Sequence, residues 1–134
     1  MATQRQIDII VIHESASPRR GDGAADINDW HLENDWSGIG YHYVIDDNGE
    51  VEAGRPEYWT GAHVKGYNTN SLGICMTGKN GNFTSAQWDM LHRLCIELKH
   101  RYAGVAFYGH RDLDEGRSCP GFDVREWCRE QHLS

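Results

Sequence analysis

A buried strand is predicted by the stretch Ile7-Asp8-Ile9-Ile10-Val11-Ile12-His13, in which a run of β-branched residues ends in a histidine. A second short apolar run, Val105-Ala106-Phe107-Tyr108, ends in the same way, because Gly109 and then His110 follow it. Ligand and active sites collect at the carboxyl ends of strands in open α/β sheets. The two histidines are therefore candidates for one common site.

Cys119 is the third candidate for this site. It lies in Ser118-Cys119-Pro120-Gly121, shortly after His110, and with the two histidines it makes a plausible zinc site of the His/His/Cys type. Three protein ligands leave a fourth position open, as in catalytic zinc sites. The same residues fit another interpretation, in which both histidines are hydrogen-bonded at strand ends and Cys119 is a small buried residue. No local feature ties His13 to His110, so both interpretations stay open here.

Local signals predict strands that alternate with helices. The Asn48-Gly49 pair indicates a hairpin between residues 41–45 and 50–53, and a further strand is expected over residues 71–77. Helices are expected over residues 24–34, from residue 84 to about residue 102, and over residues 124–131. The sequence therefore predicts the α/β class: a single domain over residues 1–134, with a central mixed sheet and helices packed on its faces.

The start of the middle helix carries the clearest local signal. Thr84 and Gln87 have the spacing of a capping box, and Phe83 and Trp88 have that of a hydrophobic staple. Apolar residues then recur at helical spacing, which predicts a face packed in the core rather than a cofactor site. Asp123 is expected to cap the last helix.

The composition excludes several classes of protein. The chain has 134 residues and a net charge of −7, which argues against binding to nucleic acid, because domains that bind it usually carry a basic face. No apolar run has the length of a membrane-spanning helix, so no stable membrane insertion is expected. The polar N-terminus is unlike a signal peptide, so we expect synthesis in the cytoplasm. Cys75, Cys95 and Cys128 are expected to be buried thiols rather than disulfide partners.

Segments along almost the whole chain resemble those of one enzyme family, in the same order. They are Ile12-His13-Glu14-Ser15-Ala16, Trp30-His31, Gly40-Tyr41-His42-Tyr43, Val51-Glu52-Ala53-Gly54-Arg55, Lys65-Gly66-Tyr67-Asn68, Asn70-Ser71-Leu72-Gly73, Gly109-His110-Arg111-Asp112 and Cys119-Pro120-Gly121-Phe122-Asp123. The chain is similar to the zinc-dependent N-acetylmuramoyl-L-alanine amidases of type 2, which share their fold with peptidoglycan recognition proteins. Within this family it most resembles small phage endolysins of the T-odd coliphage lysozyme type. The resemblance implies a peptidoglycan hydrolase that cuts the amide between N-acetylmuramic acid and the L-alanine of the stem peptide. It also implies action on the cell wall after release from the cytoplasm of the host.

The resemblance also implies roles for individual residues. One zinc ion would bind to His13, His110 and Cys119, and Tyr41 would be a catalytic residue beside it. Arg117 stands where the family often has a lysine that assists the reaction. Its guanidinium can polarise the substrate carbonyl and hold the oxyanion, but it cannot exchange a proton near neutral pH.

Substrate contacts are expected from the loop that ends in Lys65-Gly66-Tyr67-Asn68. His63 and Asn68 match a loop that lines the peptide groove in the family. Trp59 and Tyr67 could stack on sugar or peptide, and ordinary packing explains both aromatics equally well. Cys75 occupies a strand position where many relatives have a glutamate, and we interpret it as part of the core.

Other functions are also compatible with parts of the sequence. One is a peptidoglycan-recognition module without catalysis, although inactive members of the family typically lose the cysteine ligand that Cys119 matches. Another is a glycosidase, which needs two carboxylates around a sugar bond, and no such pair stands out. Some phage relatives also bind the viral RNA polymerase, and the sequence neither establishes nor excludes such an interface. We expect a monomer.

Overall fold

The computed structural model describes residues 6–15, 40–64, 66–78, 81–114, 116 and 119–133. The helix expected over residues 24–34 and the candidate residue Arg117 lie outside these ranges. Within them, no helix combines the length and the apolar character needed to cross a membrane.

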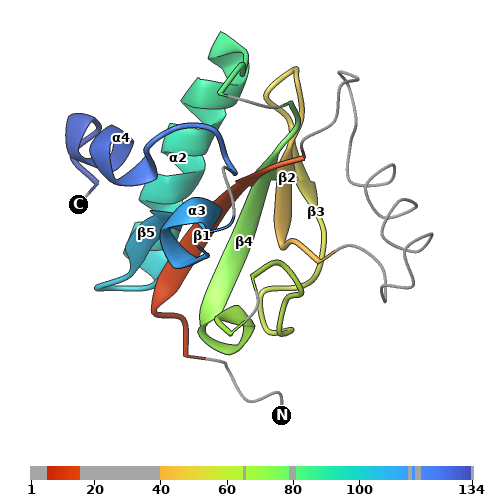
Figure 1. The fold of residues 1–134 in the computed structure, drawn as a ribbon, viewed down its shortest axis with the longest axis vertical. Helices are drawn as coiled ribbons and strands as arrows, with labels where there is room; N and C mark the ends of the chain where they lie inside the picture. The colour runs from red at the N-terminus through yellow and green to blue at the C-terminus, as the bar shows by residue number, and fades with distance from the viewer. Residues whose placement is uncertain are drawn as a thin grey trace.

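Five strands of the described chain form one mixed sheet in the order β3-β2-β4-β1-β5 (Figure 1). They are β1 (Ile9–Glu14), β2 (Tyr43–Ile45), β3 (Val51–Ala53), β4 (Ser71–Met76) and β5 (Ala106–Gly109). Only the β2–β3 pair is antiparallel among these strands, and it is the hairpin predicted from Asn48-Gly49. The expected α/β class with a mixed sheet is confirmed.

The described helices are η1 (Asn68–Asn70), α2 (Ser85–Arg101), α3 (His110–Leu113) and α4 (Val124–Glu130). The predicted capping box is present, because Thr84 accepts from the Gln87 backbone while the Gln87 side chain accepts from Thr84. The Phe83 and Trp88 rings also meet, with their centroids 5.5 Å apart. Asp123 caps α4 by accepting from the Glu126 N–H group. Short α3 was not expected from the sequence.

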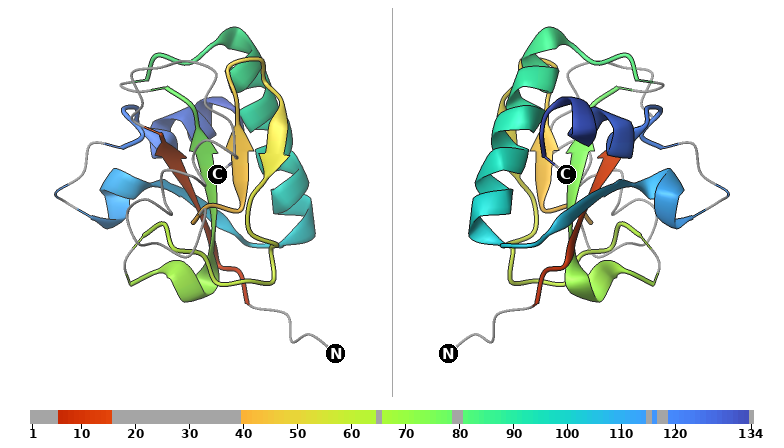
Figure 2. Two further views of the ribbon diagram at one scale, coloured as in Figure 1. Left: turned by 90° about the vertical axis from the view of Figure 1, so that its right-hand side faces the viewer. Right: turned by 90° about the vertical axis from the view of Figure 1, so that its left-hand side faces the viewer.

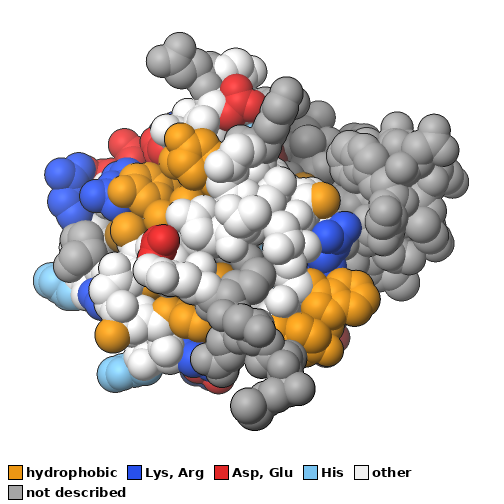
Figure 3. Space-filling view, turned by 90° about the horizontal axis from the view of Figure 1, so that it is seen from below, with side chains coloured by type: hydrophobic (Ala, Val, Ile, Leu, Met, Phe, Trp, Pro, Cys, Tyr) orange, Lys and Arg blue, Asp and Glu red, His pale blue; other side chains and the backbone are white. Residues whose placement is uncertain are grey.

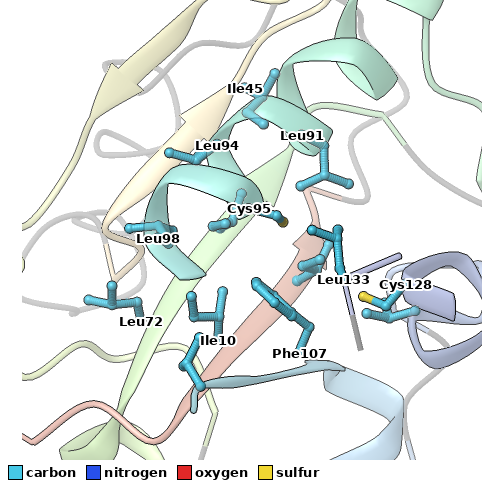
Figure 4. Close-up of a cluster of buried hydrophobic side chains, with 14 of the residues drawn as sticks. Ile10, Ile45, Leu72, Leu91, Leu94, Cys95, Leu98, Phe107, Cys128 and Leu133 are labelled. Atoms are coloured by element: carbon cyan, nitrogen blue, oxygen red, sulfur yellow. The ribbon is translucent and has the colours of Figure 1, made fainter. Parts of the chain in front are cut away.

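The two faces of the sheet carry different kinds of side chain, because successive side chains along a strand point to opposite faces. One face is apolar, and α2 and α4 cover it (Figure 2, right). Ile10, Leu72 and Phe107 from three strands pack there against Leu98 and Cys95 of α2 (Figure 4). The other face carries His13, Ser71 and Cys75, whose side chains take part in the site described below. Cys75, Cys95 and Cys128 are buried free thiols, as expected.

A carboxylate joins the loop after β3 to the carboxyl end of α2. Glu57 accepts hydrogen bonds from the hydroxyl groups of Tyr43 and Tyr102 and pairs with Arg101. Partial burial alone would raise the pKa of the Glu57 carboxyl, but the hydrogen bonds from its three partners outweigh this effect and lower the pKa. Burial and the bond to Glu57 raise the pKa of Tyr43 to about 12. This cluster fixes the loop that carries Trp59.

Replacing Glu57 by glutamine (Glu57→Gln) is expected to lower the free energy of unfolding by about 2 kcal/mol at pH 7, because several charge-assisted hydrogen bonds are lost. The folded-state pKa of Glu57 is lowered, so this contribution is present above the ordinary pKa of 4.5 and is lost as the pH falls below it. Urea unfolding of both proteins between pH 7 and pH 3 measures the difference. Glu97→Gln is the control, since Glu97 pairs with the same Arg101 on the exposed surface. An equal loss in both variants, or one independent of pH, would contradict this account.

Candidate metal centre

Strand register brings two histidines together at one end of the sheet. In the parallel β1–β5 pair, Ile12 lies opposite Gly109, so the next residues along the chain are His13 and His110. Their ring centroids are 4.7 Å apart. His13 is only 1% exposed, whereas His110 begins α3 and is partly exposed. Two residues far apart in sequence therefore meet because their strands are neighbours.

The segment before α4 brings Cys119 to the same place. The Cys119 Sγ atom lies 3.9 Å from Nδ1 of His13 and accepts a hydrogen bond of 3.1 Å from the backbone N–H group of Glu14. The backbone carbonyl of Cys119 accepts from Arg111 N–H at 2.8 Å, which fixes this segment to α3. A backbone N–H group that points at sulfur stabilises the thiolate, the form of cysteine that binds metal.

The three side chains could together hold one metal ion. One nitrogen of each histidine and the Cys119 sulfur all lie within 4.8 Å of one another. Two imidazoles and one thiolate suit zinc better than magnesium or calcium, which prefer oxygen ligands. Burial, followed by the neighbouring His63 and His110 rings, lowers the pKa of His13 well below its usual value. His13 is therefore neutral near pH 7, as a metal ligand must be.

Tyr41 lies beside this cluster, just before β2. Its ring centroid is 5.0 Å from that of His13, and the residue keeps part of its surface exposed. Burial raises the pKa of the Tyr41 hydroxyl well above its usual value, and Cys75 and Cys119 add to the effect. The hydroxyl is hydrogen-bonded to Cys75, which lies beneath it in β4. Cys75 is fully buried against Tyr41 and Val44, so its interpretation as a core residue is confirmed.

His63 occupies a buried position behind His13. Its Nδ1 atom is 3.0 Å from Nε2 of His13, and its Nε2 atom is 3.1 Å from the hydroxyl oxygen of Ser71. Both ring nitrogens therefore have partners within the protein. The sequence predicted a contact between His63 and substrate and did not predict these partners. His42 is buried nearby, with its nitrogens bonded to the backbone at Gly73 and Trp59.

Asn68 holds the loop that carries His63. Its Oδ1 atom accepts from the backbone N–H groups of His63 and Val64, each at 2.9 Å. The expected contact between Asn68 and substrate stays a prediction, and this clamp is a role that the sequence did not reveal. Asp112 also has a local role, because its carboxylate caps α3 by accepting from Gly109 N–H.

The two expected stacking aromatics are on the surface. Trp59 is 53% exposed beside Tyr58, which is 56% exposed, and Tyr67 is 37% exposed. The Tyr58 and Trp59 rings meet edge to face with their centroids 6.5 Å apart. On the face shown in Figure 3, small groups of hydrophobic side chains lie among basic and acidic ones. Trp59 and Tyr67 are therefore accessible to a ligand, as stacking requires.

Removing the Asn68 side chain (Asn68→Ala) is expected to lower the free energy of unfolding by about 1–3 kcal/mol, because two backbone N–H groups lose their acceptor. Asn68→Asp keeps an oxygen at this position and is expected to retain most of the stability. Thermal unfolding without substrate measures both variants. If Asn68→Ala unfolds like the parent protein and only the KM for substrate rises, Asn68 acts on substrate and not on the loop.

Comparison with known proteins assigns the family. The model of the N-acetylmuramoyl-L-alanine amidase family matches residues 3–122. The chain belongs to this family. It is 38% identical to the endolysin of Escherichia phage T7 over 94% of this chain and 88% of that protein. The endolysin amidase LysCS from Clostridium intestinale superposes with a TM-score of 0.85 at 28% identity, over 99% of this chain and 91% of the other.

The same fold also occurs in a recognition protein. Drosophila PGRP-LB superposes on 96% of this amidase with a TM-score of 0.81 at 25% identity, and 82% of that chain is covered. The family expected from the sequence motifs is therefore confirmed, together with the expected peptidoglycan amidase activity of the endolysin type.

Proposed function

We propose that this amidase is a zinc-dependent endolysin formed by one domain over residues 1–134. In this proposal His13, His110 and Cys119 bind one zinc ion. The enzyme cleaves the amide between the lactyl group of N-acetylmuramic acid and L-alanine in peptidoglycan. One observation carries the proposal: three good zinc donors from distant segments lie within 4.8 Å of one another. His13 and His110 lie at the carboxyl ends of two parallel strands, where active sites are expected.

When bound, zinc supplies a nucleophile near neutral pH by lowering the pKa of a water molecule, and it acts as a Lewis acid. The protein supplies the rest of the chemistry. Tyr41 is protonated near neutral pH, since burial raises a pKa that is already alkaline, and its ring lies next to that of His13. Its hydroxyl is hydrogen-bonded to Cys75 in the substrate-free structure and would donate to the substrate instead once the substrate is bound. In our proposal this hydroxyl orients the scissile carbonyl or passes a proton to the leaving amine. The charge of Arg117 holds the oxyanion of the tetrahedral intermediate.

The substrate extends over the neighbouring loop in this proposal. Trp59 and Tyr67 offer exposed aromatic surface on which a sugar ring or peptide can stack. The segment before Trp59 is anchored to α2 through Glu57, so this part of the loop would be held in place before substrate arrives. Peptidoglycan is the partner that the family indicates. The monomeric state and binding to viral RNA polymerase stay predictions.

The reaction is tested by mass spectrometry of purified peptidoglycan sacculi digested by the protein. Free stem peptides that begin with L-alanine are expected, and they should disappear after treatment with a zinc chelator and return when zinc is added. New reducing sugar ends that resist chelation would instead mean a glycosidase. A folded, zinc-loaded protein that binds sacculi without releasing products would be a recognition module.

Replacing the sulfur ligand (Cys119→Ser) is expected to abolish release of stem peptides and to reduce bound zinc below one ion per chain, because a hydroxyl is a much poorer zinc ligand than a thiolate. Metal content after dialysis measures the second effect. His100→Gln is the control, since His100 is an exposed histidine on α2. Full zinc occupancy in Cys119→Ser would remove Cys119 from the ligand set.

Removing the tyrosine hydroxyl (Tyr41→Phe) is expected to lower kcat by about 100-fold or more, the usual cost of losing a group that moves a proton. Zinc content should not change, because Tyr41 is not among the three ligands. Arg117→Ala should also lower kcat. Arg117→Lys should retain much of the parent rate, because lysine keeps the positive charge. Activity in Tyr41→Phe equal to that of the parent enzyme would exclude Tyr41 from the chemical step.

A further inference from the structure

A second imidazole lies directly behind the candidate ligand His13. The His63 ring stands perpendicular to the His13 ring, with their planes at 89° and their centroids 5.1 Å apart. Nδ1 of His63 lies 3.0 Å from Nε2 of His13 in a buried contact. His13 therefore has two differently placed nitrogens, because its Nδ1 atom lies near Cys119 and its Nε2 atom near His63.

The direction of this hydrogen bond follows from the chemistry of a metal ligand. The nitrogen that binds a metal ion must offer a lone pair, and in neutral imidazole the other nitrogen then carries the proton. With Nδ1 of His13 on the side of Cys119, its Nε2–H group donates to Nδ1 of His63. His63 then carries its own proton on Nε2 and donates to the Ser71 hydroxyl oxygen, 3.1 Å away. Donation in a single direction, from His13 to His63 and from His63 to Ser71, therefore satisfies both hydrogen bonds.

The surroundings of His63 leave its ring little freedom. A Cβ atom at Gly61 would lie 2.6 Å from Cδ2 of His63, and one at Gly73 would lie 2.7 Å from its Cγ. Only glycine at these two positions leaves space for the imidazole. Asn68 fixes the backbone of the same residue through the His63 N–H group. The fold therefore builds a close-fitting, buried pocket for a polar ring, whose burial is costly unless its nitrogens are hydrogen-bonded, as they are to His13 and Ser71.

We propose that His63 is a positioning residue of the metal centre, which orients His13 and fixes the tautomer that binds metal through Nδ1. The inference rests on the proposed zinc site. A ligand histidine usually donates its second N–H group to a carboxylate or a carbonyl, and loss of that partner weakens metal binding by about 10- to 100-fold. In this chain the neutral imidazole of His63 takes that place. This role differs from the substrate contact expected from the sequence.

Three substitutions at this residue separate the possibilities. His63→Asn places a carbonyl oxygen near the former Nδ1 position, where it can accept from His13. His63→Gln places its amide farther along, toward Ser71, and His63→Leu removes all polar atoms. Zinc affinity is measured by competition with a chromophoric chelator, and the cobalt-substituted proteins are compared by their thiolate and ligand-field absorption bands. We expect about 10- to 100-fold weaker zinc binding for Leu and Gln, altered cobalt spectra for both, and near-parental behaviour for Asn.

The same leucine substitution at His42 is the matched control for the loss of a buried imidazole. The His42 nitrogens bond the backbone at Gly73 and Trp59, so His42→Leu should destabilise the metal-free protein while leaving zinc affinity close to that of the parent. Circular dichroism of each metal-free variant reports folding. If His63→Leu does not fold, the comparison of Asn with Gln carries the test, because both are polar and of similar size.

The outcomes separate this inference from the proposed function. If the parent protein itself binds no zinc through His13, His110 and Cys119, the proposed zinc enzyme fails first. If the parent binds zinc and both His63→Leu and His63→Gln bind it equally well, the positioning role is overturned. Unchanged zinc affinity with a raised KM would also overturn it and would make His63 a substrate contact. Weaker zinc binding in Leu and Gln but not in Asn supports it.

Discussion

Parallel pairing of β1 with β5 is the constraint on which the metal centre depends. Because Ile12 lies opposite Gly109, the chain leaves both strands at the same level and presents His13 and His110 together. Neighbouring strands are only about 4.8 Å apart, close enough for two imidazoles to share an ion. A slip of one residue would turn His13 toward the opposite face and break up the site. Strand register is therefore as important to function as the identity of the ligands.

The apolar face of the sheet fixes that register. Ile10, Leu72 and Phe107 of three neighbouring strands pack against α2, and their burial is lost if any of these strands slips (Figure 4). The opposite face can then hold polar groups that would be unstable in a looser structure. His13, His63 and Ser71 form one buried chain of hydrogen bonds there. The hydrophobic core and the metal centre are thus two faces of the same strands.

The sequence predicted the features that depend on local patterns. The β-branched run before His13, the Asn48-Gly49 turn and the Thr84–Gln87 capping box each carry their signal within a few residues. The residue types at the strand ends named the ligand candidates, the motif resemblance supported them, and strand register explains how two of them meet. The environment of His63 was not predicted, because it depends on how the loop after β3 folds back over β4. The sequence signals for this environment were Gly61, Gly73 and Asn68. A glycine in the sequence does not reveal which side chain fills the space beside it.

The assignment of His13, His110 and Cys119 requires that two imidazoles and one thiolate of this amidase share one zinc ion. X-ray absorption at the zinc edge of the purified protein tests it most directly, because sulfur and nitrogen ligands differ in distance and scattering. We expect one sulfur at about 2.3 Å and two imidazole nitrogens at about 2.0–2.1 Å, with a light atom in the fourth position. The sulfur should be absent in Cys119→Ser. A first shell without sulfur in the parent protein, or with two sulfurs, would contradict the assignment of His13, His110 and Cys119.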